Sequence, residues 1–247
     1  MTDIQKRMLA TFLVLRIGVG VIGILFPILL WAGGRYHHIE LAGSMSAYYH
    51  AHAGCLDPKR TATCSVGDQV TGAGPMRNWF VGILFVIGAI MGLMRGFSRW
   101  EDGALDVAGV MAVGVALIPM PWTAIGKGFS PHGFCAITFF LCIAFVCAFC
   151  SDKTLKHMPL ECPNRNKVIA FYRRSYRILA VAMILSPIVA YVLNILSLKD
   201  SFQFFAETLG IWAFGAYWLF KTAELSNSGV EKKALTGELP LDTSKRK

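Results

Sequence analysis

Six long apolar runs, separated by mostly short connectors, constrain this chain more than any other feature of its sequence. They cover residues of about 8–31, 78–93, 104–120, 134–149, 178–196 and 202–220. A helix rises 1.5 Å per residue, so about 20 apolar residues cross a hydrocarbon core of about 30 Å. The sequence therefore predicts an all-α, polytopic integral membrane protein with six transmembrane helices.

The first run resembles a signal peptide in its position, but it differs in two respects. Its apolar part is longer than the usual core of about 7–15 residues, and no small-x-small cleavage site closes it. We therefore expect a retained first helix. Gly18, Gly20 and Gly23 within it, and the stripe Gly88-x3-Gly92-x3-Gly96 of the second run, predict helices that pack closely through small residues.

The composition supports a membrane protein and argues against a nucleic-acid-binding one. Hydrophobic residues make up 55% of the chain and charged residues 16%, against roughly a quarter charged in soluble proteins. The formal net charge is +9, but the basic residues lie mainly between the apolar runs. Cytoplasmic loops of membrane proteins carry this excess of Lys and Arg. We therefore expect membrane lipids as partners, and no nucleic acid.

Basic residues also predict which helix ends face the cytoplasm. Most fall on one side of a six-helix arrangement: Lys6, Arg7, Arg95, Arg99, those from Lys153 to Arg177, Lys221 and those at 245–247. The other side carries Arg35, Lys59, Arg60, Arg77, Lys127 and Lys199. The positive-inside rule then places both termini in the cytoplasm and the long first connection outside it. The transmembrane domain would cover 1–221, and the polar tail 222–247 is predicted to be disordered.

The long connection 33–76, expected outside the cytoplasm, contains the most distinctive segment, Ser44–His52. This segment is polar, aromatic and rich in histidine. Because a structureless loop of this length is unusual, we expect part of it to be folded, with a short interfacial helix near 41–53. Cys55 and Cys64 could pair as a disulfide in an oxidising compartment, which the sequence leaves open.

Glu207 lies about one turn inside the sixth run, at the same predicted end as the Ser44–His52 segment. A carboxylate in an apolar helix is costly unless it is paired or faces a polar cavity. Arg77 at the same depth predicts a buried salt bridge. Alternatively, His50, His132 and Glu207 could bind zinc, since two imidazoles and a carboxylate with an open position suit metal-assisted hydrolysis. Contact with a ligand or lipid headgroup is a third interpretation.

Several motifs resemble a known group of proteins. They are Ser-x-Ser-x-Tyr-Tyr-His at 44–50, Arg77-Asn-Trp-Phe-Val-Gly-Ile-Leu84, Ala108–Leu117 before Pro119, the lone His132, Asn164-Arg-Asn166 and Glu207–Gly215. The pattern resembles a widespread group of poorly characterised bacterial six-helix membrane proteins, over most of residues 40–221. This resemblance implies the topology and a location in a bacterial inner (plasma) membrane, and no particular activity.

Ser46-x3-His50 is similar to a signature of a second family. The family is the membrane hydrolase superfamily of alkaline ceramidases and progestin- and adiponectin-receptor-like proteins. The resemblance implies a histidine-bound zinc that activates water against a lipid amide, with Ser46 and His50 as catalytic residues. The chain departs from that family, because it predicts six spans rather than seven and lacks the His-x3-His pair on the last helix. His132 and Glu207 would have to replace those ligands.

Two functional hypotheses follow. In the first, a non-enzymatic membrane protein binds a lipid or small ligand in an outward-facing polar pocket, or serves as a transporter component or assembly subunit, with Arg77 and Glu207 as a buried structural pair. Tyr48, Tyr49 and Arg77 are the expected substrate-binding residues. In the second, a zinc-dependent hydrolase acts on a lipid or amide at the outer leaflet, Ser46 donates to the oxyanion or the bound water, and Arg77 clamps an anionic headgroup. A homo-oligomer or a membrane-protein partner is compatible with either hypothesis.

Overall fold

The computed structural model describes residues 1–51, 74–120, 130–159, 164–195 and 201–238, which are all-helical with no strand in these ranges. This confirms the predicted all-α class. The elements are α1 (Asp3–Tyr36), the 3-10 helix η1 (Ser46–Tyr49), α2 (Arg77–Leu93), α3 (Arg99–Leu117), α4 (Pro131–Phe145), the π-helical turn η2 (Val146–Cys150), α5 (Ser151–Leu155), α6 (Arg165–Ile195), α7 (Ser201–Ser228) and α8 (Val230–Leu235).

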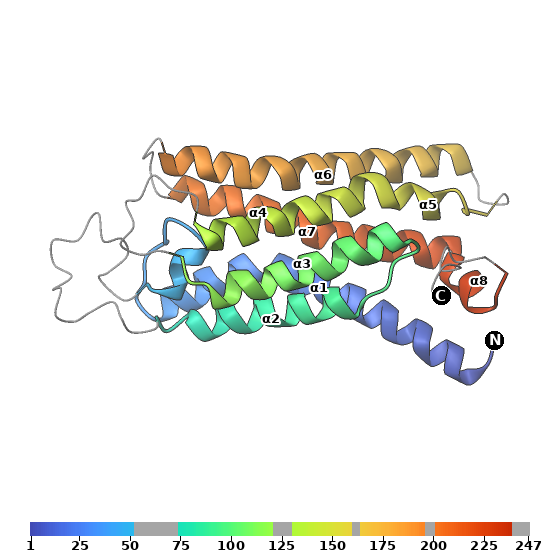
Figure 1. Cartoon of the computed structure of the whole chain (residues 1–247), viewed down its shortest axis with the longest axis horizontal. Helices are drawn as coiled ribbons and strands as arrows, with labels where there is room; N and C mark the ends of the chain where they lie inside the picture. Colours follow the sequence, from blue (N-terminus) through green and yellow to red (C-terminus); the bar gives the residue numbers. More distant parts are fainter. Residues whose placement is uncertain (52–73, 121–129, 160–163, 196–200, 239–247) are drawn as a thin grey trace, which may run out of the picture.

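The long helices lie side by side in one elongated bundle and alternate in direction along the chain (Figure 1). The main packing pairs are α6 with α7, α2 with α3, α1 with α7, and α3 with α4. The 3-10 helix η1 covers one end of the bundle, which we call the η1 end. The helix α8 and the start of α1 lie at the opposite end, which we call the α8 end.

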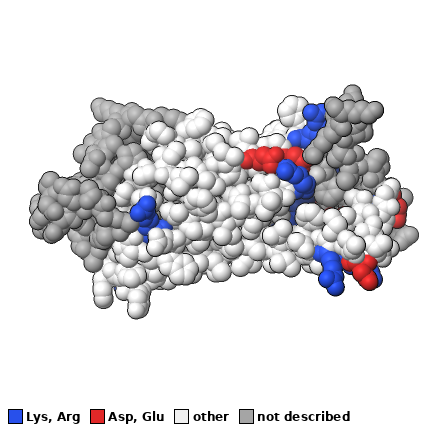
Figure 2. Space-filling view, turned by 60° about the horizontal axis from the view of Figure 1, so that its bottom comes forward, with Lys and Arg blue, Asp and Glu red and all other residues white. Residues whose placement is uncertain are grey.

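Three described helical segments are long and apolar enough to cross a membrane: Asp3–Tyr36, Pro131–Leu155 and Arg165–Leu193. The helix α2 is apolar but shorter. Large apolar side chains on the outside of the bundle fit this reading, and Val181, Leu185 and Ile188 of α6 are each about half exposed. Figure 2 shows a wide stretch of the surface without charged side chains. These observations support membrane embedding.

Small residues bring helix backbones close together, as the sequence predicts. A Cβ on Gly20 would lie 3.1 Å from the backbone oxygen of Gly215, so α1 and α7 approach closely. A Cβ on Gly88 would lie 2.8 Å from the backbone oxygen of Gly109, which couples α2 to α3 in the same way. Gly92 of the predicted stripe also lies at this contact, because a Cβ on Gly109 would lie 3.0 Å from the Gly92 backbone nitrogen, although the Cβ position of Gly92 itself faces open space.

The basic segment before the fifth predicted span is mostly helical. The helix α6 begins at Arg165, whereas the sequence predicted a span from 178. Lys and Arg are good helix formers, and Tyr172 and Tyr176 bury their rings against the bundle, which extends the helix past the apolar run. An ion pair of 2.9 Å between Arg173 and Asp152 adds a contact to α5.

The prediction of a disordered tail is wrong for residues 222–238. The helix α7 continues to Ser228, and α8 follows after Gly229, whose φ of 62° suits a residue without a side chain. Arg16 of α1 and Glu231 of α8 form a buried, two-pronged ion pair, with Nη2 and Oε2 at 2.6 Å. This pair fixes the tail to the bundle. Residues 239–247 lie outside the described residues.

Candidate functional site

The segment Ser44–Ala51 folds as a compact turn at the η1 end. Its 3-10 helix buries Ala47, Tyr48 and Tyr49. Gly34 of α1 leaves the space that the Tyr48 ring needs, because a Cβ there would lie 2.6 Å from Tyr48 Cε1. The predicted helix near 41–53 is therefore a single short 3-10 turn, packed into the bundle end. His52, Cys55 and Cys64 lie outside the described residues.

Glu207 is held by neutral donors from this turn. The Ser44 hydroxyl lies 2.8 Å from both carboxylate oxygens, the Met45 backbone N–H donates at 2.7 Å, and Gln203 Nε2 donates at 3.1 Å. A carboxylate with several such donors is stabilised without a counter-ion. The turn thus binds to α7 through the carboxylate of Glu207.

The predicted salt bridge between Arg77 and Glu207 is not formed. Both residues are described, and no ion pair joins them. Arg77 is exposed at the first turn of α2, with its guanidinium carbon 4.9 Å from the centre of the Tyr49 ring. Its charge is therefore available at the surface of the η1 end, over an aromatic face that attracts cations.

His132 and Ser46 form a close pair. His132 Nδ1 lies 2.6 Å from the backbone oxygen of Ile118, and its Nε2 lies 2.9 Å from Ser46 Oγ. A carbonyl oxygen only accepts, so in the neutral imidazole Nδ1 carries the proton and Nε2 accepts from the Ser46 hydroxyl. His132 is buried, whereas Ser46 is partly exposed. This geometry places a base beside a hydroxyl group.

His50 contacts a different acceptor. Its Nε2 lies 3.2 Å from the backbone oxygen of Met120, and its ring packs edge-on against Tyr49 at 4.7 Å. Among the described residues, no three His, Cys, Asp or Glu side chains group as a metal site would require. The predicted zinc ligands His50, His132 and Glu207 are thus brought to one end of the bundle but not to one point. Each is bonded to a different partner.

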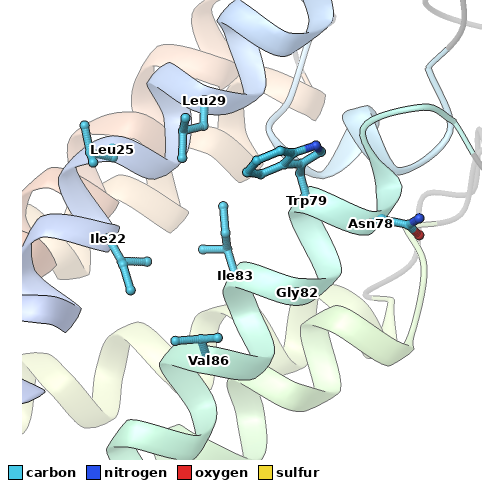
Figure 3. Close-up of a pocket in the computed structure, with 8 residues that line it drawn as sticks. All are labelled: Ile22, Leu25, Leu29, Asn78, Trp79, Gly82, Ile83 and Val86. Carbon is cyan, nitrogen blue, oxygen red and sulfur yellow. The ribbon is translucent and has the colours of Figure 1, made fainter.

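An apolar groove opens between α1 and α2 near this end (Figure 3). It has a volume of about 420 Å³. Its walls are Ile22, Leu25 and Leu29 of α1 and Asn78, Trp79, Gly82, Ile83 and Val86 of α2. Asn78, the polar residue of the lining, directly follows Arg77 in the first turn of α2. The groove therefore runs along the apolar part of the bundle, and one end of it lies at the first turn of α2, where Arg77 precedes Asn78 in the sequence.

Sequence reasoning missed two parts of this arrangement. It did not single out Ser44 as a partner of Glu207, although a serine in a short turn near a carboxylate is a common donor. It also overlooked Arg16 inside the first apolar run and Glu224 in α7, and it treated Lys221 only as a charge that orients the chain, although all three are buried at the α8 end. Charges at helical spacing in or beside apolar runs are the signal that could have found them.

No protein-family model, curated protein or solved structure matches this chain.

Proposed function

We propose that the chain is a six-span protein of a bacterial inner membrane, with the η1 end outside and both termini in the cytoplasm. The alternating directions of α1, α2, α3, α4, α6 and α7 support six spans. The helix termini at the α8 end carry most of the basic residues, which supports the orientation. A reporter fused after residue 238 that is active only in the cytoplasm should therefore be active.

We propose further that the protein binds a membrane lipid with an anionic headgroup at the outer end. The observation that carries this proposal is the apolar groove between α1 and α2, which ends at Asn78 beside Arg77. An acyl chain fits a groove walled by Leu, Ile and Val side chains. The headgroup would then lie at the N-terminus of α2, where the helix dipole and the Arg77 guanidinium both favour a negative charge.

Tyr49 and Trp79 suit such a headgroup site. Trp79 is 56% exposed on the rim of the groove, and an indole is favoured at the boundary between lipid and water. Tyr49 lies under the Arg77 guanidinium and limits where this cation can point. Tyr48 is fully buried and packs against Phe204 with ring centres 6.1 Å apart, so it shapes the turn rather than contacting a ligand.

Headgroup selectivity tests this proposal. Purified protein would be exchanged into vesicles that contain anionic and zwitterionic phospholipids, and the lipids retained after extraction would be measured. Arg77→Gln should weaken retention of the anionic lipid about fivefold, since a cation near a membrane surface contributes about 1 kcal/mol. Arg35→Gln is the matched control, because Arg35 is exposed at the same end of the bundle. Equal losses in both variants would contradict a specific headgroup site.

A second candidate function is hydrolysis of a lipid acyl group, favoured by the contact between Ser46 and His132. Ser46 Oγ would attack the ester carbonyl carbon while His132 Nε2 takes the hydroxyl proton, and His132 would return this proton to the leaving alcohol as the ester bond breaks. Water would then hydrolyse the acyl-serine, with His132 again accepting the proton and the Ile118 carbonyl orienting the imidazole. A serine-reactive fluorophosphonate should label the wild type and neither Ser46→Ala nor His132→Gln. An unlabelled, folded wild type would rule this candidate out.

The zinc-dependent form of hydrolysis requires His50, His132 and Glu207 to move together from their present partners. Elemental analysis of the purified protein tests it directly. About one zinc per chain, lost in both His50→Ala and His132→Ala, would support this form.

A further inference from the structure

Buried charges form a cluster near the α8 end, at the opposite end of the bundle from η1. Lys221 and Glu224 lie in the last turns of α7 and are 3% and 0% exposed. Lys221 Nζ lies 2.9 Å from Glu224 Oε2 and also donates to Thr154 Oγ1. The ammonium lies 5.6 Å from the centre of the Tyr176 ring. Both charges are thus removed from solvent and held by three helices.

The carboxylate of Glu224 is only half satisfied. Its Oε2 accepts from Lys221 and, at 2.6 Å, from the Tyr176 hydroxyl. Its Oε1 is buried and has no hydrogen-bond partner among the described residues. The buried hydroxyl of Tyr217, two turns before Glu224 on α7, likewise has no partner in the described part of the chain. Buried polar atoms without partners are rare in proteins, so these two atoms have hydrogen-bonding capacity that a further group could use.

A second carboxylate faces the same cluster. Glu101 of α3 is 6% exposed and interacts electrostatically with both Lys221 and Glu224. The Phe97 backbone N–H donates to its Oε2 at 2.9 Å. Gly96 leaves the room for this side chain, because a Cβ at Gly96 would collide with Glu101 Cδ. The connection between α2 and α3 therefore holds the Glu101 carboxylate beside Lys221 and Glu224.

The charges of the cluster do not balance. Two carboxylates face one ammonium, and the other polar groups that line the cluster are neutral: Cys147, Cys150, Ser151, Thr154, Tyr176 and Tyr217. Asp102 and the exposed Lys153 lie at its edge and carry opposite charges. One negative charge is left over. In a water-excluded site such a charge is strongly disfavoured, so the cluster favours the uptake of one positive charge.

We infer that Glu101 and Glu224 form, around Lys221, a buried site for one exchangeable positive charge, either a proton or a monovalent cation. Glu224 Oε1 and the Tyr217 hydroxyl are the groups that face it. The π-helical turn η2 borders this site, with Cys147 Sγ bonded to the Tyr176 backbone oxygen at 3.1 Å. Such turns interrupt a regular helix and are frequent at functional sites. The site lies apart from the lipid groove and does not depend on it.

Two measurements on the full-length protein distinguish the two kinds of charge. Infrared spectroscopy at neutral pH detects the carbonyl band of a protonated carboxyl group. Thermal unfolding in NaCl or KCl, compared with choline chloride at equal ionic strength, detects a bound cation, because a ligand of the native state raises the midpoint. Both would be made on the wild type, Glu101→Gln, Glu224→Gln and Asp106→Asn. Asp106 is the control, since it is about half exposed and pairs with Arg95.

A proton at the site predicts a carboxyl band in the wild type that is lost in Glu101→Gln and in Glu224→Gln. A cation predicts no such band, and a salt-specific rise in the unfolding midpoint that both Gln variants lose. The Asp106→Asn variant should behave as the wild type in either case. If one Gln variant fails to fold, the other carries the test. A wild type with neither the band nor the salt-specific rise overturns the inference.

Discussion

The hydroxyl of Ser44 lies 2.8 Å from both carboxylate oxygens of Glu207, across 163 positions of the sequence. Together with the Met45 backbone N–H, this contact fastens the turn at the η1 end to α7. The same turn presents Ser46 to His132 and Tyr49 to Arg77. The Ser44 contact therefore helps to hold Ser46 and Tyr49 of the turn beside their partners on α4 and α2.

Removing this donor should loosen the η1 end. Ser44→Ala should lower the free energy of unfolding by about 1.5–3 kcal/mol, the usual contribution of a hydrogen bond to a charged group. Denaturant titration of the purified protein in detergent measures the change. Glu40→Ala is the control, because Glu40 is exposed in the same connection and should change stability little. A Ser44→Ala variant as stable as that control would contradict the role of Ser44.

A methyl group on Gly34 should displace the turn. The added Cβ would lie 2.6 Å from Tyr48 Cε1, and overpacking of this kind costs about 1–3 kcal/mol. Gly18→Ala in the same helix is the matched control, because nothing lies within 4 Å of its Cβ position. That control should be neutral or stabilising by up to about 1 kcal/mol, since Ala favours a helix over Gly. If the two variants had the same unfolding midpoint, the close packing of Tyr48 against Gly34 would be contradicted.

The ion pair between Arg16 and Glu231 should hold the tail in place. Glu231→Gln leaves Arg16 buried without a counter-charge and should destabilise the protein by about 3–5 kcal/mol. The double variant Arg16→Met, Glu231→Met should recover much of this loss, because it removes both buried charges. Limited proteolysis should cut the single variant within residues 222–238 faster than the wild type. Equal cleavage would show that the pair does not fix the tail.

Stability should fall at high pH through Tyr48. Burial raises the pKa of its hydroxyl above the ordinary value of 10.0, against a smaller opposite effect of the Ala42 backbone N–H. Above pH 10 the unfolded chain therefore loses the Tyr48 proton while the folded chain keeps it, so the free energy of unfolding decreases as pH rises. Tyr48→Phe should show a shallower decrease between pH 9 and about 11. Parallel pH curves would contradict burial of this hydroxyl.

The lengths of the apolar runs predicted the long helices, because an apolar run that crosses a lipid bilayer has to form a helix of about 20 residues. The predicted second span, 78–93, differs from α2 by one residue. The close approach of α1 to α7 at Gly20 also follows from local sequence, since a glycine leaves room for a neighbouring backbone. Ser46, His50, His132 and Glu207 lie at the η1 end of the bundle. This was predictable from the alternating directions of six helices, without knowledge of any side-chain contact.

Partner identities at the site did not follow from the sequence. Arg77 and Glu207 were expected at the same depth in the membrane, which made them apparent partners. The directions of the two side chains decide the pairing, and the Arg77 guanidinium lies over the Tyr49 ring instead. The ordered tail was missed for a related reason. The helix α8 has only six residues and no strong pattern of its own, and its position depends on Arg16, which is 215 positions away.

The most direct test of the central proposal fills the lipid groove without disturbing the fold. Gly82 lines the groove, Gly92 of the same helix does not, and both have nothing within 4 Å of their Cβ positions. Native mass spectrometry would count the phospholipids retained by the wild type, Gly82→Leu and Gly92→Leu. The proposal predicts a retained phospholipid in the wild type and in Gly92→Leu, and its loss in Gly82→Leu. Equal retention in all three proteins would contradict lipid binding in this groove.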